Sequence, residues 1–277
     1  LPEWQDSAYL GRQNWPNWSV ALHTVHAPDG EGALSAETPV RARLAYDELL
    51  ANQLALQIIR AKMKKRPGRS IKGDGRLTSQ VMQSLPFELT GSQRMALAEI
   101  AADMAEPSTM LRLLQGDVGS GKTIVALFAM LEAVECGGQA ALMAPTEILA
   151  RQHMATIEPL VSAIGLKVAV LTGRGKAKAR REILADLESG EIDIIIGTHA
   201  LFQETVQLQD LMVAVIDEQH RFGVHQRLNL AAKGKGVDIL VMTATPIPRT
   251  LLLTAYGDLE TSQLREKPAG RKPIDTR

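Results

Sequence analysis

Short apolar runs alternate with amphipathic patterns from residue 87 onward. The runs occupy residues 110–114, 140–144, 167–171, 192–196, 213–216 and 239–242 and are rich in Val, Ile and Leu. Such runs are typical of strands buried on both faces of a parallel sheet. The patterns between them, for example 148–164 and 176–187, have helical spacing, which predicts right-handed strand–helix–strand units. The sequence therefore predicts an α/β fold with a doubly wound, mainly parallel sheet.

The first 85 residues follow a different pattern and predict a smaller, mostly helical segment. Thr38 can cap a helix, and Pro39 suits its first position. Apolar side chains then recur at three- and four-residue spacing and predict one apolar face, made of Tyr46, Leu49, Leu50, Leu54 and Ile58. We expect Leu49, Leu54 and Ile58 to be buried. Residues 66–76 are basic and rich in Gly, which is typical of a linker or exposed loop; a DNA-binding patch is the alternative.

The composition indicates a globular protein but does not indicate a particular function. The 277 residues are 45% hydrophobic and 22% charged, the ordinary range of a globular protein. The 31 basic and 31 acidic residues balance, so any nucleic-acid site must be a local one. No apolar run approaches the roughly 18 residues that span a bilayer. A single cysteine excludes an intramolecular disulfide, and a first residue other than Met leads us to expect a fragment of a longer protein.

One segment matches the phosphate-binding pattern G-x-x-x-x-G-K-[ST]. It consists of Gly116, Asp117, Val118, Gly119, Ser120, Gly121, Lys122 and Thr123. In this motif the backbone amides cradle an anion, the Lys reaches the β- and γ-phosphates, and the Thr hydroxyl binds Mg²⁺. The alternative is a glycine-rich turn between a strand and a helix. Because an apolar run precedes the motif and a helical pattern follows it, we predict a P-loop.

A second motif supplies carboxylates. The apolar run 213–216 leads directly into Asp217 and Glu218. An Asp at the end of a strand is the Mg²⁺ ligand of P-loop enzymes, and Glu218 beside it can act as the general base for water. Two acids also suit a helix start, where they interact favourably with the helix dipole. The P-loop upstream favours the catalytic interpretation.

Together with Gln219 and His220, these acids form a DExH box that resembles motif II of superfamily 2 helicases. Further segments resemble motifs of the same set in the same order: 89–93 the Q motif, 144–150 motif Ia, 196–199 a DNA-contacting segment and 243–246 motif III. The extended segments 217–227 and 243–250 resemble the RecG family of these helicases. The transcription-repair coupling translocases share parts of both segments and are an alternative.

The resemblance implies ATP and Mg²⁺ as cofactors and assigns roles to individual residues. Lys122, Asp217 and Glu218 are implied to be catalytic, with Thr123 and Asp217 as Mg²⁺ ligands. Phe87, Gln93, Gln219 and His220 are implied to contact nucleotide beside the P-loop, and Thr243 and Thr245 to couple nucleotide state to DNA grip. The implied DNA-binding residues are Pro145, Thr146, Arg151, Thr172, Gly173, Arg174, Thr198 and His199.

Some of these residues also have ordinary structural interpretations. Thr90 and Gln93 match a capping box, and Thr146 can be a helix cap. A single His such as His199 is more often structural than functional. The six histidines have no metal-ligand spacing with one another or with Cys136, so we do not expect a zinc site.

The resemblance divides the chain into three parts. Residues 1–85 are a helical linker between a wedge region and a motor, 86–260 a RecA-like ATP-binding lobe, and 261–277 a connector toward a second lobe that is not in this sequence. The implied protein is a monomeric bacterial, cytoplasmic DNA helicase that acts on branched DNA in recombination and repair. Since a second lobe supplies an arginine finger worth about 10³–10⁵ in rate, we expect this chain to hydrolyse ATP weakly or not at all. A nucleotide-gated DNA-binding module without turnover is the alternative from another class.

Overall fold

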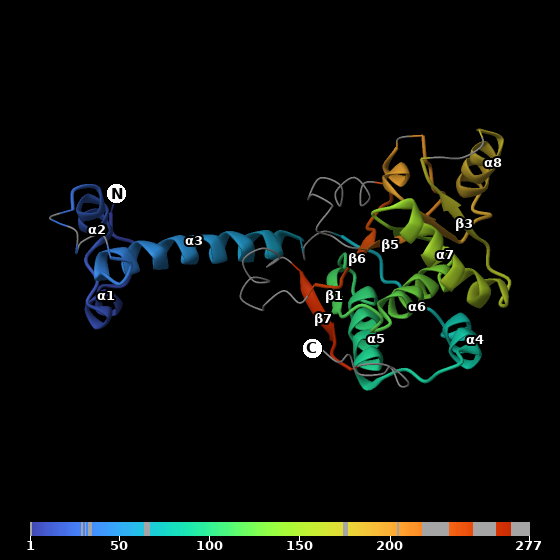
Figure 1. The fold of residues 1–277 in the computed structure, drawn as a ribbon, viewed down its shortest axis with the longest axis horizontal. Helices are drawn as coiled ribbons and strands as arrows, with labels where there is room; N and C mark the ends of the chain where they lie inside the picture. The colour runs from blue at the N-terminus through green and yellow to red at the C-terminus, as the bar shows by residue number, and fades with distance from the viewer. Residues whose placement is uncertain are drawn as a thin grey trace, which may run out of the picture. The chain divides into compact units, whose positions relative to one another are not determined.

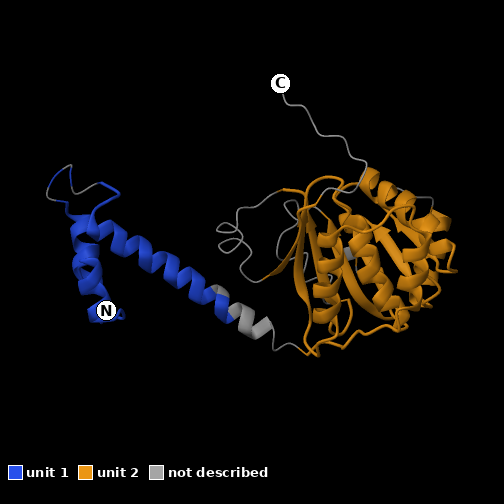
Figure 2. Ribbon diagram, turned by 90° about the horizontal axis from the view of Figure 1, so that it is seen from below, with its two compact units in different colours: residues 1–60, 249–258 blue, residues 61–248, 259–277 orange. Residues whose placement is uncertain are grey.

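The computed structural model describes residues 2–28, 30, 32, 35–63, 67–173, 177–203, 205–217, 233–245 and 259–266. The described residues fall into two compact units: a helical unit up to residue 60 and a larger unit from residue 61 onward (Figure 2). Among the described helices, none is both long and apolar enough to cross a membrane. Each unit is described separately below.

The helical unit contains α1 (Ser7–Gln13), α2 (Trp18–His26) and α3 (Pro39–Met63). As predicted, α3 begins at Pro39, and the Thr38 hydroxyl accepts a hydrogen bond from the Arg41 amide at 3.4 Å. The fully buried Arg43 guanidinium donates to Glu3 Oε1 at 2.7 Å and to Asp47 Oδ1 at 2.6 Å, and it lies over the Trp4 ring. A buried cation with two carboxylate partners therefore joins the first residues of the chain to α3.

The expected burial of Leu49, Leu54 and Ile58 is wrong. These side chains are 58%, 54% and 56% exposed. The side chains of Arg43, Tyr46 and Asp47, all near the beginning of α3, contact residues that precede the helix. The spacing of apolar residues correctly predicted one face of a helix, but periodicity alone does not supply an element that covers the face.

The larger unit is built on a seven-stranded sheet in which every neighbouring pair of strands is parallel (Figure 1). In spatial order the strands are β3 (Val168–Leu171), β4 (Ile194–Gly197), β2 (Gln139–Met143), β5 (Leu211–Asp217), β6 (Asp238–Thr243), β1 (Leu111–Gly116) and β7 (Glu260–Leu264). The predicted α/β fold with a parallel sheet is confirmed, and all six predicted strands form. β7 was missed because its residues do not form an apolar run.

The helices of this unit are α4 (Arg76–Ser84), α5 (Gly91–Met104), α6 (Lys122–Glu135), α7 (Glu147–Ser162) and α8 (Ala177–Glu188), with a 3₁₀ turn η2 (His199–Phe202). α6 contacts β1, β2 and β5, and every side chain from Ile124 to Leu131 is buried. A helix that is apolar all round is stable in water only when it is covered on all sides. Here the sheet, α4 and α5 supply that cover.

Residues 67–76, most of the stretch predicted to be a linker, belong to the larger unit. Ile71 is only 2% exposed, and the Arg69 guanidinium donates to Asp210 Oδ1 at 2.6 Å and to the Leu211 carbonyl at 2.9 Å. The interpretation of this stretch as an exposed loop or linker therefore does not hold for Arg69 and Ile71. One of its basic residues, Arg69, thus binds the start of β5.

α4 is capped by a side chain from α6. The N-cap residue Gly75 offers no side chain, and the Glu135 carboxylate instead accepts hydrogen bonds from the amides of Gly75 at 2.9 Å, Leu77, and Thr78 at 3.2 Å. Glu132, one helical turn earlier, accepts from the Gly73 amide at 3.0 Å. Because the first amides of a helix have no partner inside it, this carboxylate both satisfies them and holds α4 against α6.

Asp238 is a buried acid at the beginning of β6. Its Oδ1 accepts the Met110 amide at 2.7 Å, whereas Oδ2 is buried without a hydrogen-bond partner among the described residues. Burial raises the pKa of Asp238 from 3.8 to about 7, and the nearby Asp103 adds to this effect while the Met110 amide opposes it. Below about pH 7 the folded protein therefore favours the protonated carboxyl group.

We predict that Asp238→Asn will reduce the pH dependence of stability. Between the ordinary carboxyl pKa of about 4 and the raised value, the folded state holds a proton that the unfolded state has lost, so wild-type stability falls as pH rises through this window. Asn cannot titrate, and its Oδ1 can still accept the Met110 amide. Urea unfolding from pH 4.5 to 8 should show a flatter profile for the variant and a higher stability than wild type at about pH 8.

The exposed Asp186 on α8 provides the control. Asp186→Asn should leave the slope of stability against pH unchanged. An unchanged slope in Asp238→Asn would mean that Asp238 is ionised in the folded protein and that its burial is tolerated in another way.

Candidate functional site

The predicted nucleotide motifs lie at the ends of adjacent strands. β5, β6 and β1 are neighbours and end at Asp217, Thr243 and Gly116. Parallel strands place their carboxyl ends on one edge of the sheet, where ligands of such folds bind. Three motifs that are far apart in the sequence therefore meet along one stretch of this edge.

The segment between β1 and α6 has the backbone of a P-loop. Gly121 has a φ of 87°, and a Cβ atom there would lie 2.2 Å from Gln93 Nε2, so only glycine fits without displacing that side chain. α6 begins at the next residue, so its amino end faces the loop and favours an anion. Lys122 Nζ reaches across the loop and donates to the carbonyls of Gly116 at 2.6 Å and Asp117 at 3.0 Å. The buried Ser120 hydroxyl has no partner among the described residues, which suits a loop that takes a polar ligand.

The Gln93 side chain joins the start of α5 to the P-loop. Its Oε1 accepts the Thr90 amide at 2.8 Å, while its Nε2 donates to the Ser120 carbonyl at 2.8 Å, and the side chain is 2% exposed. The Thr90 hydroxyl accepts the Gln93 amide, so the capping box is confirmed. Contact of Gln93 with adenine stays a prediction. So does the role of Phe87, which is 47% exposed just before α5.

The two predicted Mg²⁺ ligands lie around one imidazole ring. His153, on α7, has Nε2 2.8 Å from Asp217 Oδ2 and Nδ1 3.5 Å from Thr123 Oγ1. The hydroxyl and carboxylate oxygens are hard ligands of the kind that Mg²⁺ prefers, so the donor set fits the metal. Sequence analysis did not identify His153, because nothing in the local pattern of α7 indicates a contact with Asp217 at the end of β5. Glu218, Gln219 and His220 lie outside the described residues.

The turn after β6 is hydrogen-bonded to the strand that carries the P-loop. The hydroxyls of Thr243 and Thr245 are 2.9 Å apart, and Gln115 Nε2 donates to the Thr245 carbonyl at 3.2 Å. Gln263 on β7 donates to Gln115 Oε1 at 3.1 Å. The Gln115 side chain, just before Gly116, thus contacts both β7 and the turn after β6, which is a suitable arrangement for the predicted coupling role of the two threonines.

A separate pocket lies at the ends of β2, β3 and β4. It has a volume of about 330 Å³ and is lined by Pro145, Thr146, Glu147, Gly173, Thr198, His199, Ala200 and Gln203. Five of these are among the predicted DNA-binding residues: Pro145, Thr146, Gly173, Thr198 and His199. Thr172 is buried beside the pocket, and Arg174 lies outside the described residues. The fold therefore brings together most of the predicted DNA-binding set.

The pocket has features that favour an anion. The Thr146 hydroxyl accepts the Leu149 amide at 3.3 Å, which confirms the helix cap and places the amino end of α7 at the pocket. Arg151 is exposed and pairs with Glu147 at 2.8 Å. Arg180 on α8, which the sequence did not single out, donates to Gln203 Oε1 at 2.6 Å and to the Thr172 carbonyl at 3.4 Å. It places a cation in contact with Gln203, one of the lining residues of the pocket.

The sequence profile of the DEAD/DEAH box helicase family matches residues 90–253, which include the P-loop, Asp217 and the pocket residues. The chain belongs to the DEAD/DEAH box helicase family. Among these helicases it is similar to ATP-dependent DNA helicase RecG from several bacteria, as the sequence motifs predicted. Identity is 49% to the protein of Synechocystis sp., 47% to that of Bacillus subtilis and 46% to that of Escherichia coli K12, over 93%, 94% and 92% of this chain.

A solved structure of RecG bound to a three-way DNA junction matches 99% of this chain with a TM-score of 0.82 and 43% identity. The chain covers 36% of that protein and 31–38% of the curated relatives named above. A structure of the DUF1998 helicase MrfA bound to DNA matches 72% of this chain with a TM-score of 0.54 and 18% identity, and the match covers 31% of the MrfA chain. This similarity supports the fold alone.

We predict that the two halves of the capping box have separable effects. Thr90→Ala removes one cap hydrogen bond and should lower the free energy of unfolding by about 0.5–2 kcal/mol. Gln93→Ala removes the reciprocal bond that its Oε1 accepts from the Thr90 amide and also the donor to the Ser120 carbonyl. It should therefore lower the free energy of unfolding by about 1–3 kcal/mol more than Thr90→Ala does. Urea unfolding measures both changes. Only Gln93→Ala should also weaken nucleotide binding, as measured by titration with a fluorescent ATP analogue.

Thr90→Ala is the matched control because it leaves Gln93 and the P-loop contact in place. If both variants bind nucleotide as wild type does, Gln93 is only a helix cap.

Proposed function

We propose that this chain is the ATP-binding lobe of a RecG-type DNA helicase, which acts on branched DNA such as stalled forks and Holliday junctions in recombination and repair. The observation that carries the proposal is the division of one sheet edge into a P-loop site and a neighbouring pocket with an amino-terminal helix end. Family membership and the similarity to RecG bound to a three-way junction support it.

In the proposed site the phosphates of ATP lie against the amides of residues 116–123 and the amino end of α6. Lys122 exchanges its carbonyl partners for the β- and γ-phosphates, and Thr123 and Asp217 hold Mg²⁺, which neutralises phosphate charge when bound. Glu218 orients the attacking water as general base. Gln219, His220, Thr243 and Thr245 respond to the presence of the γ-phosphate, and Phe87 and Gln93 contribute on the adenine side.

The neighbouring pocket is proposed to hold the DNA backbone. The amino end of α7 with Thr146, and the hydroxyl of Thr198, offer hydrogen bonds to phosphate, and Arg151, Arg174 and Arg180 contribute positive charge. Pro145, Thr172, Gly173 and His199 complete the proposed surface. Contacts of this kind position DNA without reading its sequence.

The remaining parts of the proposal concern the larger protein. A second lobe of the same parent chain is proposed to complete the ATP site with an arginine finger, in a monomer located in the bacterial cytoplasm. The greater length of the similar RecG proteins, of which this chain covers 31–38%, supports a larger parent protein, and their origin supports a bacterial source. On this basis the chain binds ATP but turns it over slowly.

Lys122→Ala tests the nucleotide site. Mg²⁺-ATP binding by the variant should be weaker by tenfold or more, about 1.4 kcal/mol, because the charge that faces the phosphates is lost. Calorimetric titration measures this, and steady-state hydrolysis with and without forked DNA should be slow for both proteins.

Two outcomes would contradict parts of this proposal. Rapid, DNA-stimulated and Lys122-dependent turnover would show that one lobe suffices. Binding of ATP without turnover even when the second lobe is supplied would favour the nucleotide-gated DNA-binding module.

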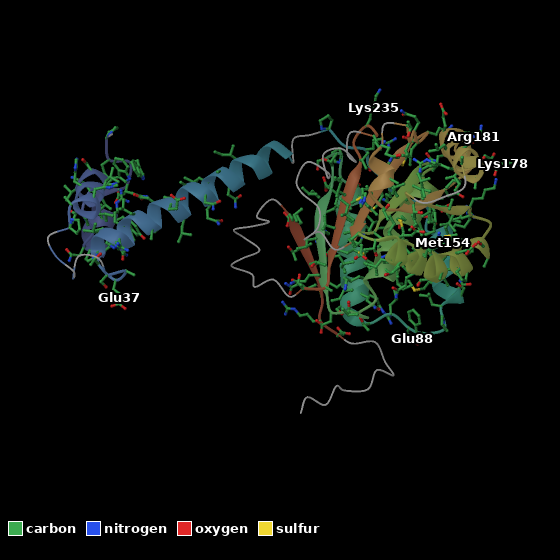
Figure 3. All side chains as sticks on the ribbon, turned by 45° about the horizontal axis from the view of Figure 1, so that its top comes forward. Glu37, Glu88, Met154, Lys178, Arg181 and Lys235 are labelled. Atoms are coloured by element: carbon green, nitrogen blue, oxygen red, sulfur yellow. The ribbon has the colours of Figure 1, made fainter. Side chains whose placement is uncertain are left out.

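Arg180→Ala tests the DNA pocket. Loss of one phosphate contact should weaken binding of forked DNA and lower the slope of log affinity against log salt by about one. Lys178, labelled in Figure 3, is a matched control because it lies on the same helix with a side chain that is 85% exposed. Lys178→Ala should change the salt slope less, and equal effects of the two variants would indicate non-specific attraction by α8. Fluorescence anisotropy at several salt concentrations measures both.

A further inference from the structure

His153 touches both predicted magnesium ligands, yet the proposed function gives it no role. It lies on α7, whose beginning lines the pocket proposed for DNA, whereas Thr123 and Asp217 belong to the nucleotide site. Figure 3 labels Met154, the next residue on this helix. The side chain of His153 therefore crosses from one half of the sheet edge to the other.

The hydrogen bonds of the ring determine which oxygens can face a cation. An ionised Asp217 carboxylate can only accept, so Nε2–H of His153 donates to Oδ2 at 2.8 Å. In the neutral ring Nδ1 is then an acceptor, and the Thr123 hydroxyl, 3.5 Å away, is oriented to donate toward it. This leaves Oδ1 of Asp217 and the lone pairs of Thr123 Oγ1 for a metal ion.

The position of the ring is fixed by the packing of α7. His153 is 9% exposed, and Ala150, Ile157 and Val161 of the same helix are fully buried. β2, which precedes α7, pairs with β5 in a register that joins Met143 to Ile216, the residue just before Asp217. A helix that starts at the end of β2 can therefore present His153 to Asp217 without a flexible connection.

We infer that His153 is a positioning residue for Mg²⁺: it orients the carboxylate of Asp217 and the hydroxyl of Thr123 so that both can bind the metal. The inference rests on the proposed function, since it assumes that these two residues bind Mg²⁺ together with nucleotide. Hydrogen-bonded partners of metal ligands commonly contribute 10–100-fold to metal affinity. A histidine that served only the packing of α7 would have no such effect.

The test is the Mg²⁺ dependence of nucleotide affinity in the 277-residue chain. Wild type, His153→Ala and His153→Gln are each titrated with a fluorescent ATP analogue, once in the presence of MgCl₂ and once in the presence of EDTA. His153→Ala should bind as wild type does in EDTA but lose about tenfold or more of the affinity gained with Mg²⁺. His153→Gln keeps an N–H donor near the position of Nε2 and should restore part of that gain.

Met154→Ala is the matched control because this neighbouring side chain packs on the core and has no hydrogen-bonding group of its own to offer Asp217 as an N–H donor. It should lower the unfolding midpoint at least as much as His153→Ala while leaving the Mg²⁺ gain intact. Binding of Mn²⁺ followed by electron paramagnetic resonance, in the presence of nucleotide, gives a second readout that does not depend on hydrolysis.

Three results would overturn the inference. The first is an unchanged Mg²⁺ gain in His153→Ala, and the second is an equal loss of affinity with and without Mg²⁺, which would mark His153 as structural. The third is failure of wild type to bind nucleotide in a Lys122-dependent manner, which would remove the proposed function as well. Because only the third outcome is a failure of the wild-type protein itself, failure of the inference and failure of the proposed function can be told apart.

Discussion

Every neighbouring pair of strands in the described sheet is parallel, and this constraint determines where each functional segment can lie. Parallel strands require a crossover after each strand, so each strand delivers its last residue to the same edge. The order β3-β4-β2-β5-β6-β1-β7 divides this edge into two halves that meet between β2 and β5. The P-loop and the pocket at the ends of β2, β3 and β4 can thus be neighbours although their residues interleave along the chain.

The same sheet must be covered on both faces, and two of the long polar side chains that this burial traps, Gln139 and Arg112, have partners. Gln139 on β2 is buried, and its amide donates to the carbonyls of Leu187 at 3.0 Å and Ile192 at 2.7 Å. Arg112 on β1 is buried between Asp103 of α5 and Ser262 of β7, at 2.9 Å from each. Because an unpaired buried polar group is costly, these bonds also fix how α5 and the end of α8 sit on the sheet.

Residue spacing in the sequence predicted the elements and motifs that depend on neighbouring residues. The six apolar strands, the start of α3 and the P-loop all follow from residue spacing, and so does the capping box at Thr90. β7 could not be predicted, because it gains stability from pairing with β1 and lacks an apolar run of its own. The contacts of His153 and Arg180 join elements that are distant in sequence. Periodicity in α3 likewise could not tell whether anything covers Leu54.

The capping of α4 by Glu135 has a consequence for how this part of the molecule opens. Amides in the first turn of a helix ordinarily exchange their hydrogens with solvent readily, because they have no internal partner. Here the amides of Gly75, Leu77 and Thr78 are bonded to a carboxylate that sits on the buried helix α6. Their deuterium uptake will therefore follow the opening of α6, so that a short surface helix exchanges as part of the same cooperative unit as the centre of the lobe.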